Sequence, residues 1–232
     1  MDQEQELKSF EQHFVELKAS VKHSFIVFVL LSVFFFAASE GLLTFMQQDL
    51  QVNLHGLTPF EVFNVRLSIS AIMGLIFSMP VMLYSFISFA KPGLTSKEYK
   101  VLKYSFPVSY ALFVSGSAFA YHVVFRNAVN FFLDYTQNAQ VEVVWGLQNT
   151  LMLGARISII SGVLFQLPLI VAILEKGGLV TVEQLKEYRA YVIVGVLLVA
   201  AVATPPDMIT QIGITLPIIL LYELSIRIVE RI

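Results

Sequence analysis

Residues 190–222 read AYVIVGVLLVAAVATPPDMITQIGITLPIILLY and decide the fold class. Two apolar runs, 190–204 and 208–222, are separated only by Pro205-Pro206-Asp207. Two adjacent prolines cannot continue a helix, so the runs predict a pair of antiparallel helices joined by a tight turn. Helices that are apolar on all sides belong in a bilayer or a very large core. The stretch therefore predicts a helical hairpin within a membrane.

The composition of the whole chain agrees with a membrane protein. Hydrophobic residues make up 56% of the 232 residues, charged residues only 14%, and the mean hydropathy is +0.74. Soluble domains carry about one-quarter charged residues. The absence of cysteine excludes disulfides, thiolate metal sites and cysteine nucleophiles. We expect one membrane domain over residues 1–232, and the acidic N-terminal region is unlike the basic start of a cleaved signal peptide.

Four further apolar runs precede the hairpin, and a bilayer crossing takes about 20 residues of helix. The predicted spans are residues 25–46, 67–90, 104–125, 147–174, 190–204 and 208–222. Twelve Lys and Arg residues lie in the N-terminal segment, in the loops after spans two and four, and at the C-terminus, against two in the other connections. This asymmetry predicts that both termini are cytoplasmic. The predicted fold is therefore an all-α integral membrane protein with six transmembrane helices.

The last two spans and the outer loops have unusual lengths. Each final span has about 15 apolar residues and covers about 22 Å, so we expect both to fall short of a full bilayer crossing. The outer segments 42–65 and 127–148 mix aromatic and polar residues. This pattern predicts amphipathic stretches that lie along the interface and cap the helix ends, with Tyr135 and Trp145 as headgroup anchors.

Few strongly polar residues fall inside the predicted spans, and such residues usually face protein or water. Arg156 lies about 15 Å toward the outer face from Gln166, and it either snorkels or pairs with Glu61 across helices. Pro168 removes the hydrogen bond to the carbonyl of Leu164. The Gln166 amide therefore either bonds that carbonyl or forms a functional polar site that faces the interior of the helix array.

Two carboxylates stand among lysines on the predicted cytoplasmic side. Glu16 is followed by Leu17 and Lys18, and Glu98 lies close to Lys97 and Lys100. Two interpretations are open. The carboxylates are solvated surface groups paired with their lysines, or they bind a cationic partner, because carboxylates hold guanidinium groups bidentately.

Several classes of function lack their sequence signals. The chain has no phosphate-binding G-x-x-x-x-G-K-[ST] loop, no G-x-S-x-G elbow, and no His or Glu cluster at metal-ligand spacing. We therefore expect no catalytic residues, no cofactor, no metal and no nucleic-acid partner, so the protein is not predicted to be an enzyme. A secondary transporter of a small solute stays as the alternative, although paired broken helices from repeated halves are not evident.

Six short motifs follow one another along the chain. They are His13-x-x-Glu16-Leu17-Lys18, Ser78-Met79-Pro80-Val81-x-Leu83-Tyr84, Phe89-Ala90-Lys91-Pro92-Gly93-Leu94 with Lys97-Glu98, Phe119-Ala120-Tyr121 with Val124-Phe125, Phe165-Gln166-Leu167-Pro168, and Thr204-Pro205-Pro206-Asp207 with Gln211. In this order, and on six spans, they resemble the motifs of the TatC family, the core subunits of the twin-arginine protein translocase. The resemblance runs over nearly the whole chain.

The resemblance implies a receptor for folded proteins whose signal peptides carry a twin-arginine motif. It implies a concave, glove-like helix array in the cytoplasmic membrane and export driven by the proton-motive force. The implied partners are TatA-type and TatB-type single-span subunits, and the implied assembly is a homo-oligomer within a larger complex. The signal-recognition residues of the family correspond here to Glu16, Leu17, Lys18, Phe89 and Glu98.

The resemblance also places a docking site for a partner helix at the hairpin, where Thr204, Asp207 and Gln211 lie at the outer helix ends. Thr204 and Gln211 either bond the partner helix, or Thr204 bonds its own preceding carbonyl while Gln211 reaches interfacial water. The chain departs from the family at two of its motifs. Lys18 replaces the usual Arg, and Gln166 stands where many relatives have Glu, which puts any titrating role at position 166 in doubt.

Overall fold

The computed structural model describes the backbone of residues 2–90, 96–140, 143–205 and 207–231, without the side chains of residues 2–17, 19, 86, 90, 96–98 and 101–102. The helices are α1 (Asp2–Leu50), α2 (Glu61–Ala90), α3 (Ser96–Phe119), the π-helical turn η2 (Ala120–Phe125), α4 (Arg126–Asn138), α5 (Leu147–Leu164), α6 (Leu167–Lys176), α7 (Val182–Glu187), α8 (Arg189–Ala203) and α9 (Met208–Arg231). Two short strands, β1 (Leu54–His55) and β2 (Trp145–Gly146), pair in parallel.

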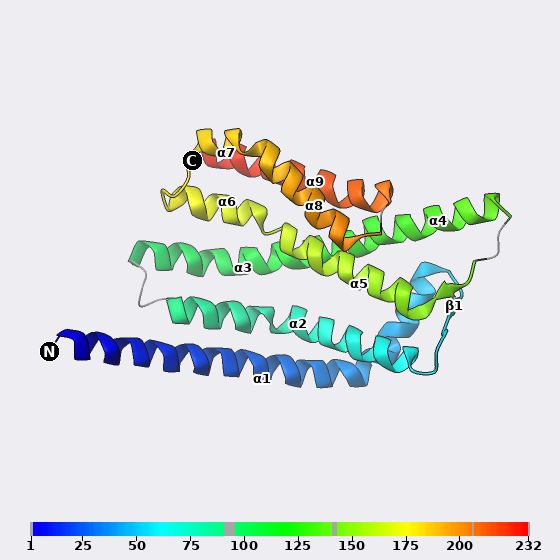
Figure 1. Ribbon diagram of the computed structural model, residues 1–232, viewed down its shortest axis with the longest axis horizontal. Coiled ribbons are helices and arrows are strands. Elements are labelled where there is room, and N and C mark those ends of the chain that lie inside the picture. The colour runs from blue at the N-terminus through cyan, green and yellow to red at the C-terminus, as the bar shows by residue number, and fades with distance from the viewer. Residues whose placement is uncertain (1, 91–95, 141–142, 206, 232) are drawn as a thin grey trace.

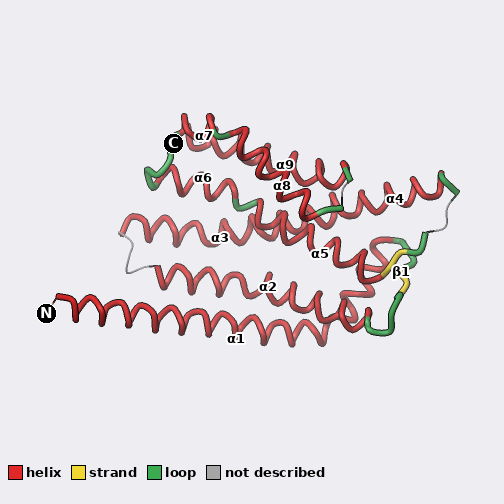
Figure 2. The backbone as a smooth tube through the Cα atoms, viewed as in Figure 1, coloured by secondary structure: helices red, strands yellow, loops and turns green. Residues whose placement is uncertain are grey.

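The long helices lie side by side in one array, which runs from α1 through α2 and α3 to α6 and α9 (Figure 1). Loops join them mainly at the two ends of the array, and both chain ends lie at the same end (Figure 2). Five helical stretches are long and apolar enough to cross a membrane, and α8 is a sixth, shorter apolar helix. The five are Ser20–Leu50, Glu61–Phe89, Lys103–Asn138, Leu147–Lys176 and Met208–Arg231. The prediction of an all-α membrane protein with five to six apolar membrane-spanning helices is confirmed.

Small residues bring these helices close together. A Cβ atom on Gly74 of α2 would collide with Ser32 of α1, and one on Gly154 of α5 would collide with the Phe125 ring. Helices in lipid associate through such close packing rather than through the hydrophobic effect. The centre of the array lies where η2, α5 and α9 meet, and its fully buried side chains include Phe125, Leu151, Ile157, Ile214 and Ile218.

The predicted fourth span, residues 147–174, is two helices rather than one. The α-helical pattern stops at Phe165, and α6 starts at Leu167 with a proline in its first turn. The backbone N–H of Gln166 donates to the backbone carbonyl of Val163 instead of to that of Gly162. This tightening leaves the Gly162 carbonyl without its backbone partner, which makes the break a position where a side chain must help.

The predicted third span, residues 104–125, continues without a loop. Through η2 it passes directly into α4, which prolongs α3 (Figure 1). The outer loops are consequently shorter than expected, and the pairing of Leu54 with Trp145 ties them together as a cap. Trp145 is partly buried and packs against the central cluster, while its role as a headgroup anchor stays a prediction.

Only one of the last two helices is short. Helix α8 has 15 residues and covers about 22 Å, whereas α9 has 24 residues and covers about 36 Å. Helix α9 continues beyond the predicted end of the span at Tyr222 and includes Arg227 and Arg231. Ile226 and Val229 in that extension are buried in a cluster with Val171 of α6 and Leu185 of α7. The C-terminal extension of α9 is therefore stabilised by packing on α6 and α7.

Candidate functional site

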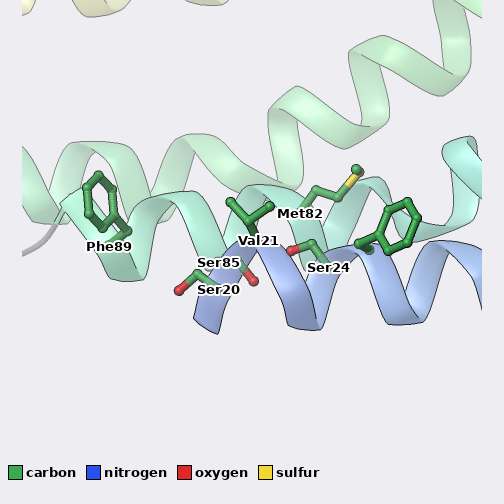
Figure 3. Close-up of a pocket in the computed structure, with 7 residues that line it drawn as sticks. Ser20, Val21, Ser24, Met82, Ser85 and Phe89 are labelled. Carbon is green, nitrogen blue, oxygen red and sulfur yellow. The ribbon is translucent and has the colours of Figure 1, made fainter. Parts of the chain in front are cut away.

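An apolar groove of about 270 Å³ lies between α1 and the second half of α2 (Figure 3). Its lining residues are Ser20, Val21, Ser24, Phe25, Met82, Ser85 and Phe89. Ser20 and Ser24 are four residues apart, as are Ser85 and Phe89, and this spacing puts each pair on one helix face. The described lining is apolar apart from serine hydroxyls, so the groove suits an apolar ligand segment rather than an ion.

The predicted signal-recognition residues surround this groove in the chain. Glu16 and Leu17 belong to α1 about one turn before the groove, and Glu98 belongs to the first turn of α3. The side chains of these three residues lie outside the described part of the chain. Lys18 is exposed, and Phe89 lines the groove near the end of α2. The structure therefore places Phe89 in the same groove as the face of α1 that begins one turn after position 16.

Gln166 forms polar contacts that join the middle helices. The Ser109 hydroxyl of α3 donates to its Oε1 at 2.7 Å, and its Nε2 donates to the Ser109 carbonyl at 3.1 Å and to the Gly162 carbonyl at 3.3 Å. Of the two interpretations of Gln166, the bond to the Leu164 carbonyl is wrong, because the side-chain amide bonds the Gly162 carbonyl instead. The side chain clamps α3 to the α5–α6 break.

Arg156 and Glu61 do not form the pair that was one of two predictions. Within the part of the chain whose side chains the structure describes, Arg156 is exposed on α5 and makes no ion pair with Glu61. Glu61 is buried, and its Oε2 accepts the Leu57 amide N–H at 2.7 Å. The carboxylate therefore holds the chain at the start of α2, and exposure of Arg156 agrees with snorkelling.

The polar residues of the α8–α9 turn bond within the hairpin. Asp207 accepts the Thr210 amide N–H at 2.8 Å and the Thr210 hydroxyl at 2.5 Å, so it caps the start of α9. The Thr204 hydroxyl donates to the Ala200 carbonyl at 3.0 Å, as one of the two interpretations predicts. Gln211 Nε2 lies 3.5 Å from the Leu197 carbonyl, a weaker contact that joins α9 to α8.

Comparison with known proteins assigns this helix array to a family. The family model described as Sec-independent protein translocase protein (TatC) matches residues 12–217. The Sec-independent protein translocase protein TatCy of Bacillus subtilis (strain 168) is 32% identical over 226 residues, covering 95% of this chain and 88% of that relative. The chain belongs to the TatC family.

Relatives with known structures share the TatC fold over nearly the whole chain. A crystal structure of the twin-arginine translocase receptor TatC aligns with a TM-score of 0.81 at 29% identity, covering 94% of this chain and 98% of that one. The chloroplastic TATC protein of Arabidopsis thaliana is 35% identical over 191 residues, which cover 81% of this chain and 56% of that relative. This TatC-family chain is therefore a membrane component of Sec-independent protein translocation, a transport protein rather than an enzyme.

Sequence reasoning missed two polar clusters of this TatC-family chain at the end of the array opposite the termini. Arg126 Nη1 lies 3.2 Å from Asp49 Oδ1, which joins the start of α4 to the end of α1. Arg66 Nε donates to the Ser39 hydroxyl at 2.9 Å, and its Nη1 lies 3.9 Å from Glu40. In the sequence, these two arginines stand out as the only basic residues in the predicted outer connections. Their partners lie on another helix, so no regular sequence spacing links an arginine to its partner.

Proposed function

We propose that this chain is the receptor that binds twin-arginine signal peptides for the export of folded proteins across the cytoplasmic membrane. The observation that carries the proposal is the groove between α1 and α2, which reaches Phe89 and begins one helical turn after Glu16. The arginine pair is assigned to Glu16 and Glu98, with Leu17, Lys18 and Phe89 beside them. An arginine pair and an apolar peptide segment would then meet one continuous surface.

The two parts of such a peptide need different surfaces. Guanidinium groups bind carboxylates bidentately, and these charge-assisted bonds contribute about 1.5–3 kcal/mol each. The apolar region of a signal peptide has about 7–15 residues, and it gains free energy where apolar area leaves water. The groove continues along α1 from Ser20 to Phe25, away from the proposed carboxylate site. The order of charge and apolar surface on α1 therefore matches the order within a signal peptide.

Orientation and partners belong to the same proposal. Both termini are assigned to the cytoplasm, because Lys and Arg concentrate in the connections on that side of the predicted topology. TatA-type and TatB-type single-span subunits are the proposed partners, with the proton-motive force as the driving force and a homo-oligomer within a larger complex. The proposed docking surface is the α8–α9 hairpin, where α8 has only 15 residues and Val202 is 81% exposed.

Peptide binding tests this function directly. We expect the purified chain to bind a twin-arginine peptide at least about tenfold more tightly than the matched twin-lysine peptide. Glu16→Ala and Glu98→Ala should each remove most of that preference, whereas Glu187→Ala, an exposed carboxylate on α7, should retain it. Equal binding of both peptides by the unaltered chain, or an unchanged preference in both Glu→Ala variants, would contradict the proposal.

A groove variant separates the apolar part of the site from the charged part. Ser85→Phe fills the groove without changing a charge, so it should weaken binding of the full signal peptide. A peptide shortened to the arginine pair should bind the Ser85→Phe variant and the unaltered chain equally. Weakening of both peptides to the same extent would place the apolar segment elsewhere.

A further inference from the structure

A second groove lies between α3, α6 and α9. Its apolar part, of about 310 Å³, is lined by Val108 and Leu112 of α3, Leu169 and Ala172 of α6, and Leu221 and Leu224 of α9, among others. An adjoining hollow of about 450 Å³ shares Val108, Leu169 and Ala172 with it. The shared residues make the two hollows one continuous groove that opens toward the start of α3 and the end of α6.

The open end of this groove carries positively charged side chains and side chains with hydroxyl groups. Its described lining includes Lys100, Tyr104, Ser105 and Lys176. Both lysines are exposed, and no carboxylate is among the described lining residues. Two cations with two hydroxyls form a surface complementary to a phosphate group, since ammonium groups bind phosphate as point charges.

The length of the groove matches one leaflet of a bilayer. From Lys100 to Leu112 the α3 helix rises about 18 Å, compared with about 15 Å for half of a hydrocarbon core. The apolar part reaches Pro168 at the α5–α6 break, and no described residue of α5 lines it. A groove that ends near mid-bilayer suits a lipid chain, whereas a transmembrane helix of a partner would need a surface across both leaflets.

We propose that this groove binds one anionic phospholipid of the leaflet in which Lys100 and Lys176 lie. The phosphate sits between the two lysines, and an acyl chain lies along Val108, Leu169 and Ala172. Basic pockets between transmembrane helices are known to hold anionic head groups, and each lysine near such a group contributes about a fivefold gain in affinity. The site is separate from the α1–α2 groove, so it stands whether or not that groove binds signal peptides.

A single tryptophan makes the test specific, because Trp145 is the only one in the chain. In a Trp145→Phe background, Val108→Trp reports on the groove and Val194→Trp on an ordinary lipid-facing position. The two sites match in exposure, 51% and 54%, and each lies five residues after a basic residue, Lys103 or Arg189. The proteins are reconstituted in equal parts of phosphatidylglycerol and phosphatidylcholine, with brominated acyl chains on one lipid or the other.

The groove tryptophan should be quenched preferentially by brominated phosphatidylglycerol, with a relative affinity of roughly 30-fold over phosphatidylcholine. The Val194→Trp control should show no more than a small preference. Lys100→Gln with Lys176→Gln should abolish the groove preference, whereas Lys22→Gln with Lys103→Gln, which removes two exposed charges outside the groove, should retain it.

Three results would overturn the proposal. Equal quenching ratios at the two tryptophans would show that the groove does not select the anionic lipid. A preference that survives loss of Lys100 and Lys176 would assign it to another feature of the surface. A preference that inorganic phosphate removes while groove quenching by both lipids becomes equal would identify the site as one for free phosphate.

Discussion

Two proline-containing interruptions of the membrane helices solve the same backbone problem in different ways. At the α5–α6 break, Gln166 bonds Ser109, a residue 57 positions earlier in another helix. At the α8–α9 turn, Asp207 bonds Thr210, three positions later in the same hairpin. Unpaired backbone groups are costly where water is scarce, so each interruption needs such a side chain.

The difference separates a clamp from a cap. Gln166 joins two helices, so its loss should loosen the packing of α3 on the α5–α6 pair. Asp207 satisfies the first turn of one helix, so its loss should affect mainly the start of α9. A proline beside a polar residue therefore indicates an interruption in the sequence, but it does not tell whether the polar side chain acts locally or across the array.

The largest loss of stability is expected when Gln166, which clamps α3 to the α5–α6 break, is replaced. Gln166→Leu removes three hydrogen bonds and leaves the carbonyls of Ser109 and Gly162 without this partner. We expect the free energy of unfolding, measured by SDS titration, to fall by about 2–4 kcal/mol. Gln211→Leu, the same substitution beside the other interruption, loses one contact of 3.5 Å and should cost less than about 1 kcal/mol. Equal losses at the two positions would contradict the distinction.

Export measured per folded molecule then tests the functional prediction for Gln166. The sequence leaves open a functional polar site facing the interior of the array, and in that case Gln166→Leu should reduce export more than its loss of stability explains. A normal rate per folded molecule would assign Gln166 to the clamp alone.

A smaller loss of stability is expected from a substitution at the glycine that packs against the α5–α6 break. A Cβ on Gly116 of α3 would collide with the Phe165 ring next to Gln166. Gly116→Ala should therefore lower the free energy of unfolding by about 1–3 kcal/mol, because overpacking forces side chains from their preferred positions. Gly195→Ala on α8, where nothing lies within 4 Å of the added atom, should not lower it. A stable Gly116→Ala variant would show that Phe165 can move without releasing the clamp.

Sequence reasoning succeeded where the signal is local to one segment. Six apolar runs and the tight turn at Pro205 follow from composition and short spacing, whereas the bond from Thr204 to its own helix was only one of two open interpretations. It failed where a contact decides the outcome. Helix α9 passes Tyr222 because Ile226 and Val229 pack on α6 and α7, and α4 prolongs α3 because the backbone continues through a π-helical turn.

The residues of the candidate site show the same difference between local sequence signals and contacts that depend on packing. The polar partner of Gln166 could not be predicted, because nothing in spacing or hydropathy links position 166 to Ser109. Phe89 was named through family resemblance, and its place in the α1–α2 groove depends on how the two helices pack. Motifs thus indicate which residues belong to a site, whereas the hollow that they line follows from packing between distant segments.

The cap should contribute less than the clamp. Asp207→Ala removes the acceptor for the Thr210 amide N–H and hydroxyl. Loss of such a helix cap costs about 1 kcal/mol, within a range of about 0.5–2 kcal/mol. Asp207→Asn keeps a side-chain oxygen in place and should recover most of the loss in the same SDS titration. A cost at Asp207 as large as that at Gln166 would mean that the turn also supports contacts outside the hairpin.

The smallest effect on stability, with the largest consequence for assembly, is expected at Thr204. Thr204→Val keeps the side-chain volume and removes one hydrogen bond to Ala200, so the free energy of unfolding should change by less than about 1 kcal/mol. The proposed docking of a single-span partner at this hairpin predicts weaker partner association, since interhelical hydrogen bonds in membranes contribute about 0.6–2 kcal/mol.

Cysteine crosslinking measures the contact cleanly, because the chain has no native cysteine. Thr204→Cys and Gln211→Cys should link to the partner's span, whereas Val114→Cys on α3 should not. Crosslinks of equal yield from all three positions would show that the hairpin is not a specific docking surface, and Thr204 would then serve only its own helix.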